Sequence, residues 1–438
     1  MTVYESALRL DGMYHAFNHL EEPAEPGSEG RLAGYYLSVK DNLCVRGMPA
    51  TAGSRILEGY MPPFDATAVA RCRAEGAAVL GKTAMDEFGF GTFSVNSGYG
   101  VPLNPCDTGR SAGGSSGGAA AVTASAGFPH VALAESTGGS ISCPAAFCGV
   151  VGVTPTYGRV SRWGLIDFAN SLDKVGCMAA TVGEAALTLS VISGPDEYDS
   201  TAQRVPAPDY AAYVGGGVEG MRVGVPREYF GEGVDPGVAD RVWAGIKKLE
   251  SLGAIVSDVS LPYTGVSLSS YYVVAMAEAS TNLARFSGLR YGLHMPLEGN
   301  FDEYFSAVRS AGFGEEAKRR IILGTYARMA GYRDAYYLKA LRVRTLVIGN
   351  FKRAFRDVDV LAAPTMPVVA PRFEEIAGLE PLQHYMMDVL TVAPNLAGVP
   401  MISVPCGKCG GMPVGLHLMA DHMREDLVMR AAGALEVA

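Results

Sequence analysis

The chain has 438 residues, of which 48% are hydrophobic and 18% are charged. This composition suits a folded protein with a sizeable core and excludes a mainly disordered chain. Asp and Glu number 45 against 36 Lys and Arg, which gives a formal charge of −9. Such a chain is a poor candidate for holding a nucleic-acid backbone by itself.

The sequence shows no membrane or secretion signal and no metal-binding pattern. It has no uninterrupted run of 18 apolar residues, and its N-terminus lacks the basic start and apolar stretch of a signal peptide. Eight scattered cysteines are typical of reduced, buried thiols, and Cys406 and Cys409 form a lone C-x-x-C pair. The seven histidines have no metal-ligand spacing. We therefore expect a cytoplasmic protein without a metal site.

The predicted elements alternate between strands and helices. In chain order they are a strand at 35–39, a helix at 66–75 capped by Asp65, a strand at 77–80, a helix at 119–126, a strand at 131–134, helices at 236–252, 315–332 and 338–356, and strands at 359–363, 401–404 and 414–418. This alternation predicts an α/β fold. We expect a single domain over residues 1–438, with a core at about 31–195 and 357–438 and a helix-rich insertion at about 236–356.

Three residues invite a catalytic interpretation: Lys40 at the end of a predicted strand, Ser115 within the run GGSSGG, and Ser140 at the end of the run TGGS. Gly/Ser loops by themselves are more often ordinary turns. A serine hydroxyl nevertheless becomes a nucleophile when a base takes its proton, and a lysine can be that base if burial keeps it neutral near pH 7. Consecutive glycines also let main-chain N–H groups converge on a developing oxyanion.

Other motif interpretations fail on their context. Residues 113–117 match G-x-S-x-G, but the preceding segment is loop-like and that motif requires a strand there. Ser171 and Lys174 match S-x-x-K, a pattern short enough to occur by chance. No Walker A sequence is present, so the glycine loops are not a standard phosphate site.

Four segments resemble the amidase signature family. They are SVKDNL from Ser38, GKTAMDEFGFG at 81–91, NPCDTGRSAGGSSGGAAAV at 104–122, and STGGSISCPAAFCGVVGVTPTYGRVSRWG at 136–164. The likeness continues to the C-terminus, and within the family it is strongest to the A subunits of GatCAB-type tRNA-dependent amidotransferases. It implies the amidase-signature fold, in which a central mixed β-sheet is sandwiched by helices and carries a helical middle insertion.

The resemblance also implies catalytic roles. Ser140 matches the acyl-forming nucleophile, Ser115 the bridging serine that usually follows a cis peptide, and Lys40 the base. The loop that forms the oxyanion hole corresponds to Thr137, Gly138 and Gly139. The sequence departs from the common pattern at Ser136, where an acidic residue often stands, and at Ser142, where arginine is usual.

A second set of residues matches those that hold the amino-acid end of glutamine. Arg320 corresponds to the residue that binds the α-carboxylate and Asp388 to the residue that binds the α-ammonium, while Tyr272 is expected to line the pocket. Arg319 and Tyr271 remain alternatives in each case. Four charged neighbours also leave open the possibility that Arg320 is a solvated helix charge.

The resemblance implies a glutaminase subunit that binds no cofactor of its own. Ammonia from glutamine would pass to a B subunit, which uses ATP and magnesium to convert Asp-tRNA(Asn), Glu-tRNA(Gln) or both, while a C subunit braces the complex. Misacylated tRNA would be held mainly by the B subunit. The alternatives are a free-standing amidase of another small amide and a non-catalytic assembly subunit.

Overall fold

The computed structural model describes residues 2–437. Its strands are β1 Phe17–Leu20, β2 Tyr36–Lys40, β3 Ala78–Thr83, β4 Leu103–Asn104, β5 Asp107–Ser111, β6 His130–Ser136, β7 Val151–Thr154, β8 Lys174–Ala179, β9 Arg222–Pro226, β10 Ile255–Val259, β11 Val360–Pro364, β12 Met401–Cys409 and β13 Met412–Ala420. Its α-helices are α1 Val3–Tyr14, α2 Thr67–Ala74, α3 Gly117–Ser125, α4 Ser142–Cys148, α5 Val182–Ile192, α6 Pro236–Ser251, α7 Thr264–Asn282, α8 Phe301–Gly312, α9 Glu315–Arg328, α10 Lys339–Asp357, α11 Phe373–Ala377, α12 Pro381–Met386, α13 Val392–Ala397 and α14 Glu425–Val437.

Eleven of the described strands form one mixed sheet, in the order β1-β3-β2-β6-β8-β7-β12-β13-β11-β9-β10. Strands β3, β2 and β6 run parallel, as do β11, β9 and β10, whereas the strands between these groups pair antiparallel. The predicted α/β fold with a central mixed sheet is confirmed. Among the residues described, no helix has the length and apolar character needed to cross a membrane.

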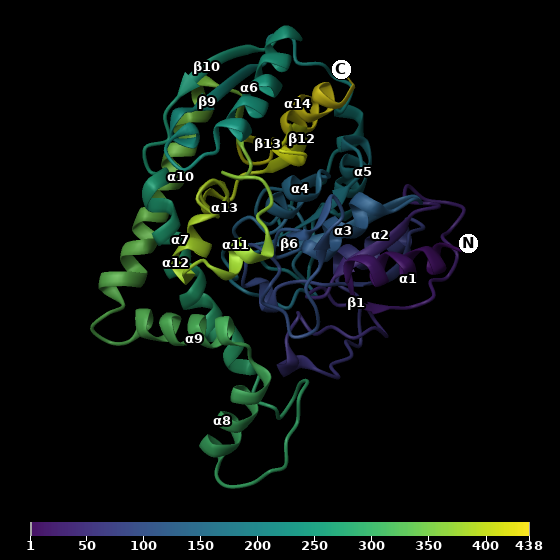
Figure 1. The fold of residues 1–438 in the computed structure, drawn as a ribbon, viewed down its shortest axis with the longest axis vertical. Helices are drawn as coiled ribbons and strands as arrows, with labels where there is room; N and C mark the ends of the chain where they lie inside the picture. Colours follow the sequence, from purple (N-terminus) through teal and green to yellow (C-terminus); the bar gives the residue numbers. More distant parts are fainter. Residues whose placement is uncertain (1, 438) are drawn as a thin grey trace.

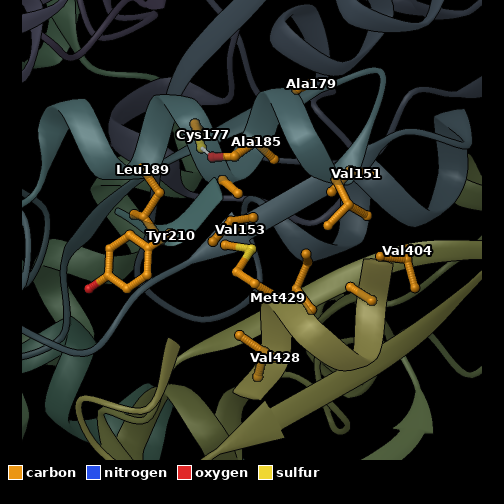
Figure 2. Close-up of a cluster of buried hydrophobic side chains, with 14 of the residues drawn as sticks. Val151, Val153, Cys177, Ala179, Ala185, Leu189, Tyr210, Val404, Val428 and Met429 are labelled. Carbon is orange, nitrogen blue, oxygen red and sulfur yellow. Dashed lines mark hydrogen bonds between the residues drawn. The ribbon is translucent and has the colours of Figure 1, made fainter. Parts of the chain in front are cut away.

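Helices cover both faces of the sheet because the side chains of each central strand alternate between two cores. On β6, Val131 and Leu133 pack in the same core as α2, α5, α6 and α14, while Ala132 and Ala134 pack in the opposite one with α3 and α4. Figure 2 shows part of the first core, where Val153 of β7 lies between Leu189 of α5 and Met429 of α14.

The helix-rich middle segment begins later than the sequence pattern predicts. Residues 222–259 contribute β9 and β10 to the edge of the sheet, and α6 packs on that sheet, so the purely helical run starts with α7 at Thr264. Helices α7, α9 and α10 pack beside the sheet, and α8 extends away from it at one end of the molecule (Figure 1).

Most predicted elements exist, and the differences lie at their ends. Asp235 caps α6 as expected, since its side chain accepts hydrogen bonds from the main chain of Gly237 and Val238 at 2.8 and 3.1 Å. The predicted Asp65 cap is wrong: α2 begins at Thr67 without a side-chain cap, because the Asp65 carboxylate accepts from the Arg46 N–H at 2.7 Å instead.

Candidate active site

The site forms where parallel strands β2 and β6 end side by side. Lys40 is the last residue of β2, and Glu135 and Ser136 are the last two residues of β6. The carboxyl ends of parallel strands meet at one edge of a sheet, which is where open α/β folds commonly place ligand sites. The sequence pattern predicts a strand that ends at residue 134, and the structure corrects this: β6 continues through Ser136.

The loop before α3 brings Ser115 to this edge. The Gly114–Ser115 peptide is cis, and the Lys40 side-chain amine donates a hydrogen bond of 2.8 Å to Ser115 Oγ. Both residues are fully buried. The structure therefore joins two residues that lie 75 positions apart in the sequence, as the resemblance implied.

Ser140 lies between β6 and α4 and remains slightly accessible, with 6% of its surface exposed. Within residues 2–437, no main-chain hydrogen bond engages the N–H groups of Gly138, Gly139 and Ser140. These three donors are free to bind a ligand oxygen, which is the property that an oxyanion hole requires. The N–H group of Thr137 is likewise without a main-chain hydrogen bond among the described residues, and its side-chain Oγ1 lies 2.8 Å from Glu135 Oε1.

The glycine loop is fixed from outside by α7 and α13. The Asn395 side chain donates a hydrogen bond of 2.6 Å to the Gly138 carbonyl. A Cβ atom added at Gly138 would lie 2.5 Å from Tyr271 Oη, and one added at Gly139 would meet the Thr391 side chain. Only glycine therefore fits at these two positions.

Arg320 is buried, which excludes its interpretation as a solvated helix charge. Only 3% of the residue is exposed, and its Nε donates a hydrogen bond of 2.8 Å to Glu316. The guanidinium carbon lies 4.9 to 5.6 Å from the ring centroids of four aromatic residues, namely Phe90, Phe168, Tyr272 and Tyr385. Arg319 has a side chain that is 40% exposed, so the buried position belongs to Arg320.

Asp388 is the partly buried carboxylate of the same region. Its two carboxylate oxygens accept hydrogen bonds from Tyr272 Oη at 2.6 Å and from Thr92 Oγ1 at 2.9 Å. Burial raises the pKa of Asp388, while these two donors and the charge of Arg320 oppose that rise. A pocket of about 390 Å³ reaches this region from solvent and is lined by residues that include Thr92 and Arg320.

Adjacent tyrosines on α7 connect the two parts of the site. Tyr271 lies against Gly138 of the glycine loop, and Tyr272 is bonded to Asp388. Thr391 makes a second connection, because it lies against Gly139 and donates to the main-chain oxygen of Asp388 at 3.1 Å. Tyr271 and Tyr272 are therefore both part of the site, in different places.

Sequence reasoning missed four polar residues here: Thr92, Glu135, Asp173 and Glu316. Two of them had a visible signal. Glu135 ends an otherwise apolar strand, where an unpaired charge would be costly, and Glu316 stands four positions before Arg320, the spacing of a helical ion pair. Thr92 and Asp173 come from loops and had no local signal. Ser171 and Lys174, which match S-x-x-K, are hydrogen-bonded to other residues. The Ser171 hydroxyl donates to Glu278, and the Lys174 amine donates to the Val399 carbonyl.

Residues 10–429 match the protein family described as Amidase. The chain belongs to this family. Its relatives include proteins named as the A subunit of glutamyl-tRNA(Gln) amidotransferase. The one from Methanococcoides burtonii is 52% identical over 93% of this chain and 85% of its own length, and the one from Natronomonas pharaonis is 51% identical over 95% and 98%.

Solved structures of amidases show the same fold. The A subunit of the glutamyl-tRNA(Gln) amidotransferase from Thermotoga maritima has a TM-score of 0.85 and 38% identity, and the match covers 99% of this chain and 90% of that one. A peptide amidase from Stenotrophomonas maltophilia has a TM-score of 0.79 and 28% identity, with coverage of 99% and 92%.

Proposed function

We propose that this chain is the glutaminase subunit of a tRNA-dependent amidotransferase. The names of its relatives support this role, and so does the pair of opposite charges, buried Arg320 and partly buried Asp388, beside the glycine loop. A free amino acid carries a carboxylate and an ammonium group, which such a pair can bind together. This charge pair is the observation that carries the proposal. An amidase of some other small amide would have no need of it.

The proposed reaction proceeds through an ester on Ser140. Ser140 Oγ attacks the side-chain amide carbon of glutamine while its proton passes to Ser115, whose own proton passes to the neutral amine of Lys40. The oxyanion is held by the N–H groups of residues 137 to 140. The C–N bond then breaks, the proton returns through Ser115, and ammonia leaves. Water hydrolyses the glutamyl ester to glutamate and restores Ser140.

We further propose that the ammonia is used elsewhere in a complex. A B subunit would activate the side chain of Asp or Glu on misacylated tRNA with ATP and magnesium and then aminate it, and a C subunit would brace the assembly. The net charge of −9 supports a chain that leaves the tRNA to its partner. Both Asp-tRNA(Asn) and Glu-tRNA(Gln) are substrates to be tested.

The test is ammonia release from glutamine by the purified chain, alone and with candidate B and C subunits, ATP and misacylated tRNA. We expect slow release alone and strong stimulation in the complex. Ser140→Ala should abolish glutamine-driven amidation and preserve amidation driven by ammonium chloride. Hydrolysis of other amides without any glutamine turnover would replace the proposal with a free-standing amidase, and equal activity of Ser140→Ala and the wild type on glutamine would remove Ser140 from its role.

A further inference from the structure

The Lys40 amine has three acceptors around it. Its Nζ lies 2.8 Å from Ser115 Oγ, 2.9 Å from the Glu135 carbonyl oxygen and 3.0 Å from Glu135 Oε2. An ammonium group has three N–H bonds, so each of them has a partner here. This is the geometry of charged Lys40, and a nitrogen that donates three hydrogen bonds has no lone pair left to receive a proton from Ser115. Burial alone therefore does not explain how Lys40 becomes a base.

Only one of the three acceptors can take a proton from the Lys40 ammonium group and so restore the lone pair on its nitrogen. A main-chain carbonyl and a hydroxyl oxygen are far weaker bases than a carboxylate. We propose that Glu135 is a positioning residue that makes Lys40 available as a base by taking one ammonium proton on Oε2 and returning it at the end of each turnover. This inference rests on the proposed function, in which Lys40 receives the proton of Ser140 through Ser115.

The proton transfer conserves charge. Moving one proton from Lys40 Nζ to Glu135 Oε2 converts a buried ion pair into a neutral amine and a neutral carboxylic acid. When Ser140 forms its bond to the amide carbon, its proton reaches Lys40 through Ser115, and the new ammonium charge balances the oxyanion. Loss of ammonia uses that proton, and the neutral amine serves again as the base when water attacks the ester. Glu135 gives its own proton back to Lys40 once the ester is hydrolysed. No step leaves an unpaired charge in the buried site, which would be costly.

The position of Glu135 on its strand explains why it is the residue that reaches Lys40. Successive residues of a strand point to opposite faces, so Glu135 and its neighbour Ser136 face different environments. The Glu135 carboxylate meets Lys40 and also accepts a hydrogen bond of 3.0 Å from the Asn42 amide. Ser136 Oγ is buried without a hydrogen-bond partner in the described part of the chain.

The other carboxylate oxygen of Glu135, Oε1, is linked through the Thr137 hydroxyl to a second buried carboxyl group, that of Asp173. Thr137 Oγ1 lies 2.8 Å from Glu135 Oε1 and 2.9 Å from Asp173 Oδ1. One hydroxyl proton cannot serve both, so one of the carboxyls has to carry a proton of its own. Burial, together with the charge of Glu135, raises the pKa of Asp173 well above its usual range. Asp173 is thus the protonated partner, and Glu135 is left as the charged acceptor that faces Lys40.

Other ionisable groups face this pair from the surrounding elements. Asp86 lies on the loop after β3, where its charge interacts with Lys40, and burial raises the pKa of Asp86 to about 6. The charges of Glu135 and Asp173 act on Tyr271 of α7. The charge of Arg320 of α9 acts on both Asp86 and Tyr271. The experiment must therefore separate the titration of Asp86 from the effect of Glu135 on Lys40.

The experiment follows the nucleophilicity of Ser140 directly, without glutamine. The rate of sulfonylation of Ser140 by phenylmethylsulfonyl fluoride, measured by mass spectrometry of the full-length chain, is recorded against pH for the wild type, Glu135→Gln and Glu135→Asp. In the wild type the Lys40 proton moves only to Glu135 and is not released to solvent, so the rate should be maintained to low pH and show its acid limb there. In Glu135→Gln the Lys40 proton must leave the site, so this acid limb should move up by about one to three pH units.

The controls make the outcome decisive. Glu135→Asp keeps a carboxylate and should retain the low-pH limb even if its maximal rate falls, and Ser136→Ala should leave the profile unchanged. A limb that stays in place in Glu135→Gln while only the maximal rate falls would show a purely structural residue and overturn the proposal. If the acid limb moves in Asp86→Asn and not in Glu135→Gln, the limb belongs to Asp86. This result would also overturn the proposal.

The probe also separates this inference from the proposed function. Normal labelling of Ser140 with the expected Glu135 dependence, but no glutamine hydrolysis with or without partners, would remove the glutaminase and leave the Glu135 proposal standing. Absence of Ser140 labelling in the wild type at every pH would remove both.

Discussion

Tyr272 Oη donates a hydrogen bond of 2.6 Å to Asp388 Oδ2, although the two residues are 116 positions apart in the chain. The bond stabilises the charged form of a carboxylate that is otherwise destabilised by burial. In the proposed function, that charge holds the α-ammonium group of glutamine. This hydrogen bond lowers the pKa of Asp388 and so helps to set the pH below which substrate binding weakens.

We expect the KM for glutamine to rise at acidic pH, because protonation of Asp388 removes its charge and burial has raised the pKa at which this occurs. Tyr272→Phe deletes a donor to the carboxylate, so the same rise should begin at higher pH. Charge-assisted hydrogen bonds contribute about 1.5 to 3 kcal/mol, which corresponds to a KM increase of roughly tenfold or more at neutral pH. Steady-state kinetics from neutral pH down through the acid range would test this. Identical KM profiles for the two proteins would contradict it.

Arg320→Lys should raise the KM for glutamine at least about tenfold, because a lysine cannot pair with Glu316 and offer a planar fork to a carboxylate at the same time. Arg319→Lys is the matched control: the neighbouring side chain is 40% exposed, so its replacement should have little effect. Circular dichroism melting curves check that both variants fold. A larger effect from Arg319→Lys would transfer the carboxylate-binding role to that residue.

Gly138→Ala should reduce acylation of Ser140 by about 10² or more, the usual effect of losing one oxyanion donor. The new methyl carbon would lie 2.5 Å from Tyr271 Oη, so the loop must shift and its N–H groups with it. Gly127→Ala is a suitable control, because nothing lies within 4 Å of a Cβ atom there. Burst kinetics with a chromogenic amide would report the acylation step, and an unchanged burst rate in Gly138→Ala would show that the loop does not hold the oxyanion.

Lys174→Met should stabilise the protein, most strongly at low pH. Burial lowers the pKa of Lys174 to about 7, and its amine has one hydrogen bond, of 3.1 Å, to the Val399 carbonyl. In the unfolded chain the amine binds its proton up to a much higher pH, so the free energy of unfolding of the wild type should rise between pH 7 and the ordinary lysine pKa of about 10.4.

The comparison uses urea denaturation at acidic and alkaline pH. At a pH below 7 we expect the variant to gain on the order of 2 kcal/mol, after allowance for the lost hydrogen bond. At alkaline pH, where the wild-type amine is neutral when folded, the difference should shrink. A gain that is the same at both pH values would point to packing rather than charge.

The sequence by itself determined the elements and the chemistry that local patterns encode. The alternation of apolar runs and amphipathic segments predicted β2, β6, α6 and α10, because hydrophobic periodicity follows directly from backbone geometry. Lys40, Ser115 and Ser140 stood out because each lies in or beside a long segment that matches one family. Boundaries were less certain, as at Asp65, because a carboxylate can satisfy a distant N–H group as easily as the start of a helix.

Only the tertiary structure decided which charges are buried and what they face. Local spacing could not distinguish Arg320 from Arg319, since both lie on the same turn of α9, and the difference comes from the aromatic rings that surround one of them. Nor could it show that Glu135 meets Lys40, because that contact depends on the parallel pairing of β2 with β6. Burial and long-range pairing fix the energy of a charge, and neither property is a function of neighbouring residues alone.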